Sequence, residues 1–160
     1  AIAMLRALGH EQIAVCEIQG SKWEAARNAG ASVCINPHDA GALEQLQALA
    51  GGVWGIVDLV GAEDTASLAI AALRKGGRYI IVGLYGGQLS LSLVPVVQRA
   101  MTIQGSYVGS LQEMHEVVEL ARNGRLKPIP TAVCSMQEVS GILDQPKDET
   151  VHGRVVAKAD

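Results

Sequence analysis

Short apolar runs alternate with helix-like segments along most of the chain, and this alternation constrains the fold more than any other feature. The runs 12–18 (QIAVCEI), 53–61 (VWGIVDLVG) and 78–87 (RYIIVGLYGG) are short, rich in aliphatic residues and bounded by polar residues or glycine, as strands are. Segments 62–77 and 110–124 carry apolar residues at helical spacing. The order of these segments predicts an α/β fold with a doubly wound parallel sheet.

Local signals also predict where the helices begin and end. Ser21 stands three residues before Glu24, a spacing typical of a capping box, and Gly30 is a suitable stop for the helix that follows. The next long helix, 62–77, has acids in its first turn and Arg74 and Lys75 near its end. That charge order suits the helix dipole, so we expect both basic residues in the last helical turn.

Composition excludes several classes of protein. The chain has 160 residues, is 49% hydrophobic and carries a formal net charge of −3, which gives no electrostatic support for nucleic-acid binding. No apolar stretch reaches the roughly 18 residues that a membrane-spanning helix needs, and no secretion signal is recognisable. The three cysteines, Cys16, Cys34 and Cys134, show no C-x-x-C spacing, so we expect buried or half-buried free thiols and a cytoplasmic protein.

The histidines give no metal signature. His10, His38, His115 and His152 are scattered through predicted turns and helices, without the paired spacing of a zinc site. We therefore expect no metal ligands in this chain.

Glu17 is the lone acid near the end of an apolar run, and this position carries the first functional hypothesis. In dinucleotide-binding folds, an acid at such a strand end accepts hydrogen bonds from the adenosine ribose and repels a 2′-phosphate, which favours NAD over NADP. A solvated charge at a strand end is the alternative reading of the same residue. Lys22 follows where a cation could line the adenosine side. The strand and G-x-G-x-x-G loop that usually precede such an acid are not in the sequence, which opens with a helical pattern.

Six stretches, in this order and spacing, resemble the zinc-dependent medium-chain alcohol dehydrogenases: CEIQGSKWEAARNAGASVCINP, IVDLVGAEDT, LRKGGRYIIVGLYGG, MTIQGSYVGS, ELARNGRLKP and GRVV. The resemblance covers essentially the whole chain as the C-terminal, NAD-binding half of such an enzyme. It implies a Rossmann-like doubly wound parallel sheet that lacks the first strand and the glycine-rich loop.

The resemblance also implies a role for individual residues. Glu17 resembles the ribose-binding acid, Lys22 its basic neighbour, and Arg154 the arginine that reaches back to the pyrophosphate, a task that suits a guanidinium group. The other implied cofactor-binding residues lie at strand ends: Val60, Gly61, Val82, Gly83, Leu84, Ser106, Tyr107 and Val108.

Each of these roles has a plainer alternative. The valines suit a sheet core, the glycines suit strand exits, Ser106 suits a bond to the backbone, and Arg154 suits a surface charge. Asp58 is expected to bond a neighbouring loop rather than to act in catalysis, and Trp23 and Trp54 are expected to pack.

Domain organisation follows from the same resemblance. Residues 1–108 would form the NAD-binding domain, and residues 109–160 a bridging helix and a C-terminal segment that returns to the catalytic domain. Without the first strand, the inner edges of strands 12–18 and 53–60 lack partners, which is costly. We expect the edges to close on each other, another chain to supply a strand, or the sequence to be part of a longer protein, and we favour the last. The strand 101–107 could continue the sheet across a dimer axis, so a homo-oligomer, dimer or tetramer, is expected.

The functional hypothesis is the cofactor-binding portion of an NAD-dependent zinc-type alcohol dehydrogenase, which passes hydride between nicotinamide and an alcohol or its aldehyde or ketone. Zinc and the catalytic residues would come from the intact enzyme, so this chain alone is expected to be inactive. One alternative is a non-catalytic nucleotide-binding or interaction module. Another is an NADPH-dependent quinone or enoyl reductase of the same superfamily, which Glu17 disfavours.

Overall fold

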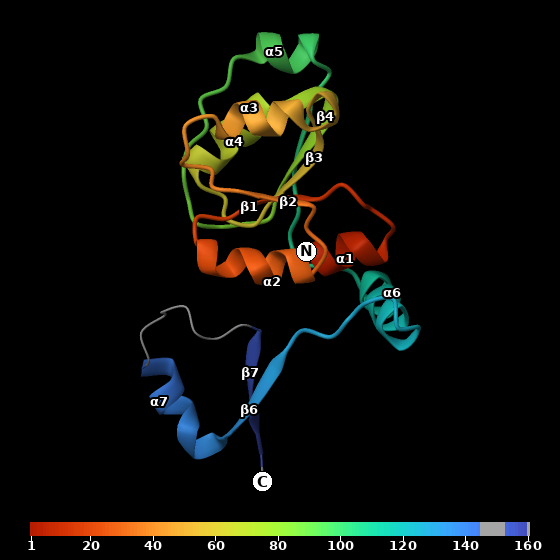
Figure 1. The fold of residues 1–160 in the computed structure, drawn as a ribbon, viewed down its shortest axis with the longest axis vertical. Coiled ribbons are helices and arrows are strands. Elements are labelled where there is room, and N and C mark those ends of the chain that lie inside the picture. The colour runs from red at the N-terminus through yellow and green to blue at the C-terminus, as the bar shows by residue number, and fades with distance from the viewer. Residues whose placement is uncertain (145–152, 160) are drawn as a thin grey trace.

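The computed structural model describes residues 1–144 and 153–159, and every strand pair in it is parallel. Strand β1 (Ala14–Cys16) pairs with β2 (Val33–Ile35). Strands β3 (Val53–Asp58), β4 (Leu73–Ile81) and β5 (Thr102–Gly105) form a second sheet in that order. A third sheet pairs β6 (Thr131–Ser135) with β7 (Arg154–Lys158) and lies apart from the others (Figure 1). The predicted parallel α/β architecture is confirmed, divided among three sheets.

Helices connect these strands in the expected order. They are α1 (Ile2–Ala7), α2 (Trp23–Asn28), α3 (Ala42–Ala48), α4 (Glu63–Ala72), α5 (Leu93–Gln98), α6 (Leu111–Arg122) and α7 (Val139–Asp144). Short 3-10 turns at Gly20–Lys22, Leu49–Gly51 and Met136–Glu138 adjoin α2, α3 and α7. The predicted stop at Gly30 is confirmed, since its φ of +113° is one that glycine adopts without strain.

Two predicted helix boundaries are wrong. Ser21 lies inside the 3-10 turn, so Lys22 is the N-cap of α2 and no side chain caps this helix. Arg74 and Lys75 belong to strand β4 rather than to the last turn of α4. The pairing of Leu73 with Val53 in the parallel ladder extends β4 back over these residues, and that tertiary contact outweighs their suitability for a helix end.

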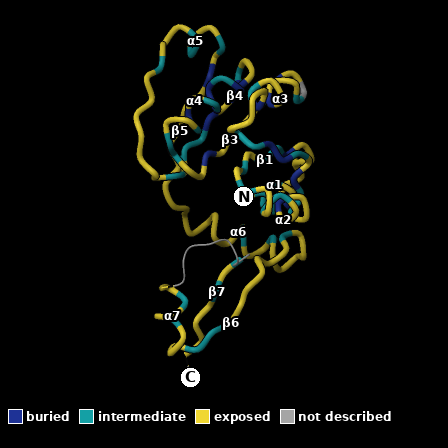
Figure 2. The backbone as a smooth tube through the Cα atoms, turned by 60° about the vertical axis from the view of Figure 1, so that its left-hand side comes forward, coloured by how far each residue is buried: buried dark blue, intermediate teal, exposed yellow. Residues whose placement is uncertain are grey.

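Apolar packing in the described residues centres on α4, α3 and α2, shown by the buried segments in Figure 2. One cluster packs α4 on the β3–β5 sheet and contains Ala66, Ala69, Ile70, Leu73, Tyr79 and Met101. A second joins β2, α3 and α4 through Ile35, Ala42, Leu46 and Ala72. A third packs α2 on β2 through Ala26, Ala31 and Cys34. The first two sheets are therefore connected through the packing of α3 on α4.

Strand β3 is less buried than its sequence predicts. Ile56 packs into the core and Asp58 is buried, whereas Trp54 and Val57 are 55% and 46% exposed. Val57 points to the sheet face opposite Ile56, and no strand pairs with the inner edge of β3 in the described part of the chain. Of the three outcomes expected for the unpaired inner edges, closure of β1 on β3 is therefore wrong, because the two strands belong to separate sheets.

Candidate functional site

The carboxyl ends of β3, β4 and β5 stop in one row. Asp58 is in register with Ile81, and Ile81 with Gly105. Backbone hydrogen bonds continue past this row. The amides of Val82 and Gly83 donate to Asp58 O at 2.9 and 3.0 Å, and the amide of Ser106 donates to Ile81 O at 2.8 Å. Eight predicted cofactor-binding residues follow this one sheet edge: Val60, Gly61, Val82, Gly83, Leu84, Ser106, Tyr107 and Val108.

The buried carboxylate of Asp58 shapes the turn that follows β3. Its Oδ1 accepts the amides of Val60 and Gly61 at 2.8 and 2.9 Å, and its Oδ2 accepts the Tyr79 hydroxyl at 2.7 Å and lies 2.8 Å from Thr65 Oγ1. Burial alone would raise the pKa of this carboxyl, but the bonds from Gly61, Tyr79, Thr65 and Val60 together lower it below its ordinary value. Asp58 is hydrogen-bonded to a loop, as predicted, but this loop is the turn that directly follows its own strand rather than a neighbouring loop.

Gly61 and Gly83 bring two strand ends into backbone contact. A side chain at Gly61 would overlap the carbonyl group of Gly83, and one at Gly83 would overlap the backbone of Val60. Gly61 also has a φ of +75°, and the amide of Tyr85 donates to Val60 O at 3.0 Å. The edge therefore presents close-packed backbone, which only residues without a side chain permit at these two positions.

The side chains along this edge face outward. Val60, Val82 and Val108 are 48%, 38% and 82% exposed, so the alternative that they form sheet core is wrong. Leu84 and Tyr107 are each more than four-fifths exposed. Val108 has a φ of +48°, a conformation that a β-branched residue rarely adopts.

Glu17 directly follows β1 and is held by its backbone. Its amide donates to Ile35 O at 3.0 Å, and its carbonyl accepts the indole N–H of Trp23 at 2.9 Å. Its carboxylate Oε1 accepts the amide of Gln19 at 2.9 Å. Lys22 lies nearby in sequence at the end of the 3-10 turn. These residues come from the β1–β2 sheet, which no ladder joins to β3–β5 in the described residues.

Arg154 lies in the separate β6–β7 sheet. It opens β7 opposite Thr131, its side chain is exposed, and its Nη1 donates to Gly153 O at 3.0 Å. Figures 1 and 2 both show this sheet apart from β3–β5. The structure therefore groups the strand-end residues but does not bring Arg154 to them, and its role at the pyrophosphate stays a prediction. His152 lies outside the described residues.

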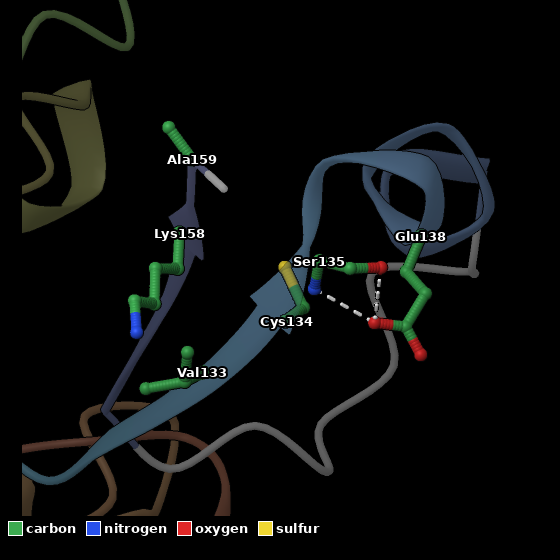
Figure 3. A pocket seen from close by; sticks show the side chains of 6 residues that line it. All are labelled: Val133, Cys134, Ser135, Glu138, Lys158 and Ala159. Carbon is green, nitrogen blue, oxygen red and sulfur yellow. Dashed lines mark hydrogen bonds between the residues drawn. The ribbon is translucent and has the colours of Figure 1, made fainter.

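Neither of two cavities found among the described residues encloses the predicted site. The larger, of about 360 Å³, is lined by Val133, Cys134, Ser135, Glu138, Lys158 and Ala159 (Figure 3). Bonds from the backbone and side chain of Ser135 lower the pKa of the Glu138 carboxyl there. The smaller, of about 130 Å³, is lined by Gly61, Ala62, Glu63, Ala66, Tyr79, Ile81, Gly87, Gln88 and Leu89. The strand edge is thus an open surface that shares Gly61 with the smaller cavity.

The described residues do not fit a zinc centre. No group of three or more histidine, cysteine, aspartate or glutamate side chains converges among them. Cys34 is buried and Cys134 half-buried as free thiols, as predicted, whereas Cys16 is exposed. Among the described helices, none has the length and apolar character needed to cross a bilayer.

Sequence reasoning missed three side chains that hold this site. Tyr79 and Thr65 support the Asp58 carboxylate from β4 and α4, and Trp23 supports the Glu17 carbonyl from α2. Tyr79 is followed directly by the apolar residues of its strand, where a buried hydroxyl needs a partner, and that was the available signal. No sequence signal marked the contact of Trp23.

Comparison with known protein sequences finds alcohol dehydrogenases as relatives. An NAD-dependent alcohol dehydrogenase of Sulfolobus acidocaldarius is 39% identical over 108 residues, which are 67% of this chain and 31% of that protein. An alcohol dehydrogenase of Geobacillus stearothermophilus is 27% identical over 160 residues, all of this chain and 47% of the relative. The chain thus spans less than half the length of these relatives.

Solved structures agree in fold. The alcohol dehydrogenase of the archaeon Aeropyrum pernix matches with a TM-score of 0.77 and 28% identity, over 91% of this chain and 42% of that one. The benzyl alcohol dehydrogenase of Acinetobacter calcoaceticus has a TM-score of 0.84 at 19% identity, over 99% and 46%, and supports the fold alone. These matches confirm the predicted Rossmann-like α/β fold. The family profile described as zinc-binding dehydrogenase matches residues 1–123, and the chain therefore belongs to the zinc-binding dehydrogenase family.

Proposed function

We propose that this chain is the NAD-binding portion of an NAD-dependent zinc-type alcohol dehydrogenase that acts on an alcohol and its aldehyde or ketone. The observation that carries the proposal is the row of three parallel strand ends, Asp58, Ile81 and Gly105, together with a carboxylate directly after β1. Open α/β sheets bind ligands outside the carboxyl ends of their strands. The NAD-dependent relative from Sulfolobus acidocaldarius supports the choice of cofactor.

Glu17 would bind the adenosine ribose. A carboxylate can accept about four hydrogen bonds, and the Gln19 amide uses one of them, which leaves capacity for two ribose hydroxyls. A 2′-phosphate would bring negative charge against this carboxylate and bind more weakly. Lys22 would line the adenosine side, and Arg154 would reach the pyrophosphate in the intact protein.

The β3–β5 edge would hold the nicotinamide half. The backbone at Val60–Gly61 and Val82–Leu84 and the segment Ser106–Val108 would orient the ring and its carboxamide. When bound, NAD supplies the hydride acceptor or donor. The exposed Leu84 and Tyr107 favour an apolar alcohol beside it. We assign no zinc ligand or catalytic residue to the described residues, so alcohol oxidation belongs to the whole protein and not to this chain alone.

The remaining organisation is proposed with it. Residues 1–108 form the NAD-binding domain, and residues 109–160 bridge to the catalytic domain. The protein is cytoplasmic and forms a homodimer or homotetramer, with the exposed edge of β5 as the candidate contact.

A non-catalytic nucleotide-binding module is the second candidate, since the strand-end backbone and Glu17 would suffice to bind a nucleotide without taking part in chemistry. It predicts binding of NAD without alcohol-dependent formation of NADH by the full-length protein. An NADPH-dependent quinone or enoyl reductase predicts preference for NADP instead, and Glu17 opposes it.

The test is calorimetric titration of the protein with NAD and, in a parallel titration, with NADP. The molecular mass of the protein in solution is measured on the same sample. We expect NAD to bind more tightly than NADP, at a mass that is a multiple of the protomer's. Equal affinities, or tighter binding of NADP, would refute the assignment of Glu17. Absorbance of NADH after addition of alcohols to the full-length protein then separates the enzyme from the binding module.

A further inference from the structure

Trp23 contacts Glu17 through a bond that the backbone ladder does not supply. Strand β1 ends at Cys16, so the Glu17 carbonyl lies beyond its paired residues. The indole Nε1–H of Trp23, the first residue of α2, donates to this carbonyl at 2.9 Å. A backbone carbonyl that follows a strand end is here bonded by a side chain six residues later.

The bond fixes the peptide on the carboxyl side of Glu17. Its amide is already held by Ile35 O at 3.0 Å. With the carbonyl held as well, the two peptide planes flanking the Cα atom are set, and the direction of the side chain follows from them. The Gln19 amide, 2.9 Å from Oε1, then holds the carboxylate itself.

Trp23 is in turn held by its surroundings. Its half-buried ring packs against the cluster of Ala26, Ala31 and Cys34. The guanidinium carbon of Arg27 lies 5.7 Å from the ring centroid, within the range of a cation–π contact. A donor held by these two contacts loses little conformational freedom in making its bond, so it can position the group that it contacts.

We propose that Trp23 is a positioning residue for Glu17 and thereby sets the preference for NAD over NADP. The inference rests on the proposed function, in which Glu17 binds the adenosine ribose. Packing alone would be met by phenylalanine, but an indole donates a hydrogen bond and a phenyl ring cannot. The prediction is therefore specific to the N–H group and separable from the volume of the ring.

The experiment compares the full-length protein with its Trp23→Phe variant by calorimetric titration of NAD and NADP. We expect the dissociation constant for NAD to rise about three- to ten-fold, the effect of disturbing one hydrogen-bonded group. NADP keeps the 3′-hydroxyl but brings its 2′-phosphate against the carboxylate, so its binding depends less on this group and its dissociation constant should change by less than about two-fold. The dissociation constant for NADP divided by that for NAD should therefore fall. An unchanged ratio, including equal weakening of both cofactors, would overturn the inference and assign Trp23 a structural role.

Controls separate the N–H group from other effects. Trp54→Phe removes the second tryptophan, which also lies beneath an arginine, Arg74, and should leave the ratio unchanged. Replacement of Trp23 by benzothienylalanine keeps the bicyclic shape but exchanges N–H for sulfur, and should reproduce the effect where phenylalanine disturbs folding. In a Glu17→Ala background, Trp23→Phe should no longer alter the ratio, since both act on one group. Additive effects of the two substitutions would contradict a positioning role.

The outcomes distinguish the inference from the proposed function. If the unmodified protein binds no NAD or prefers NADP, the proposed function fails and the role of Trp23 falls with it. If the unmodified protein prefers NAD and Trp23→Phe keeps that preference, the proposed function stands and the positioning role is overturned.

Discussion

Tyr79→Phe isolates the contribution of one buried hydrogen bond. Tyr79 is fully buried, and its hydroxyl donates to Asp58 Oδ2 at 2.7 Å. Phenylalanine keeps the ring in the apolar cluster, so no cavity is created. The carboxylate keeps its bonds to Val60, Gly61 and Thr65 but loses one donor.

The expected cost follows from the charge on the acceptor. Hydrogen bonds to charged groups contribute about 1.5–3 kcal/mol, so we expect the free energy of unfolding to fall by about 2 kcal/mol at neutral pH. For a chain of 160 residues, such a loss lowers Tm by about 4–8 °C.

The difference in the free energy of unfolding between the unmodified protein and Tyr79→Phe should shrink at both low and high pH. The pKa of Asp58 is lowered in the folded state, so its stabilisation is present above the ordinary value of 3.8 and is lost as the pH falls through the folded value. Burial, the Asp58 hydrogen bond and the Asp58 charge raise the pKa of Tyr79, so its stabilisation is present below the ordinary value of 10.0 and is lost as the pH rises through the folded value. The difference between the proteins should therefore be greatest on a plateau between these limits and shrink on both sides.

Chemical denaturation at several pH values measures the effect. Tyr85→Phe is the matched control, because Tyr85 is 82% exposed and should change stability by less than about 0.5 kcal/mol. A loss below about 0.5 kcal/mol for Tyr79→Phe, or an equal loss at acid and neutral pH, would refute this account of the Asp58 network.

Three further predictions test the site and the backbone. Glu17→Ala should weaken the binding of NAD and reduce the difference in affinity between NAD and NADP, as measured by calorimetric titration. An unchanged preference for NAD would contradict the role of the acid. Gly83→Ala should lower the free energy of unfolding by about 2 kcal/mol, because its new Cβ would overlap the backbone of Val60. Gly105→Ala is the control, since open space surrounds Gly105, and it should change the free energy of unfolding by less than about 1 kcal/mol. Equal losses for the two variants in chemical denaturation would count against the close approach of the two strand ends. Ala100→Gly should raise stability by about 1 kcal/mol, since its φ of +48° suits glycine, and a lower Tm would refute that reasoning.

The order of strands and helices could be predicted because it depends on local features. Short aliphatic runs bounded by glycine or polar residues indicated β3 and β4, and the apolar spacing of 110–124 indicated α6. The strand-end residues were predictable for the same reason, since the end of an apolar run marks the edge of a sheet.

The contacts that hold the site depend on register, which local patterns do not encode. Tyr79 meets Asp58 because β4 pairs with β3 in a particular alignment, across 21 residues of sequence. The same alignment places Arg74 and Lys75 in β4 instead of α4. Trp23 reaches Glu17 because a 3-10 turn, not a capped helix start, leads into α2.

The junction between the first two sheets has a mechanical consequence. The two sheets are connected by the packing of α3 on α4 and by a hydrogen bond from the side-chain Nε2 of Gln47 to Ala71 O at 3.2 Å. Strands β1 and β3 share no ladder in the described residues. A ladder fixes its strands in register, whereas this junction depends on how the apolar side chains of α3 and α4 pack together. The spacing between Glu17 and the β3–β5 edge is therefore set by the volumes of those side chains.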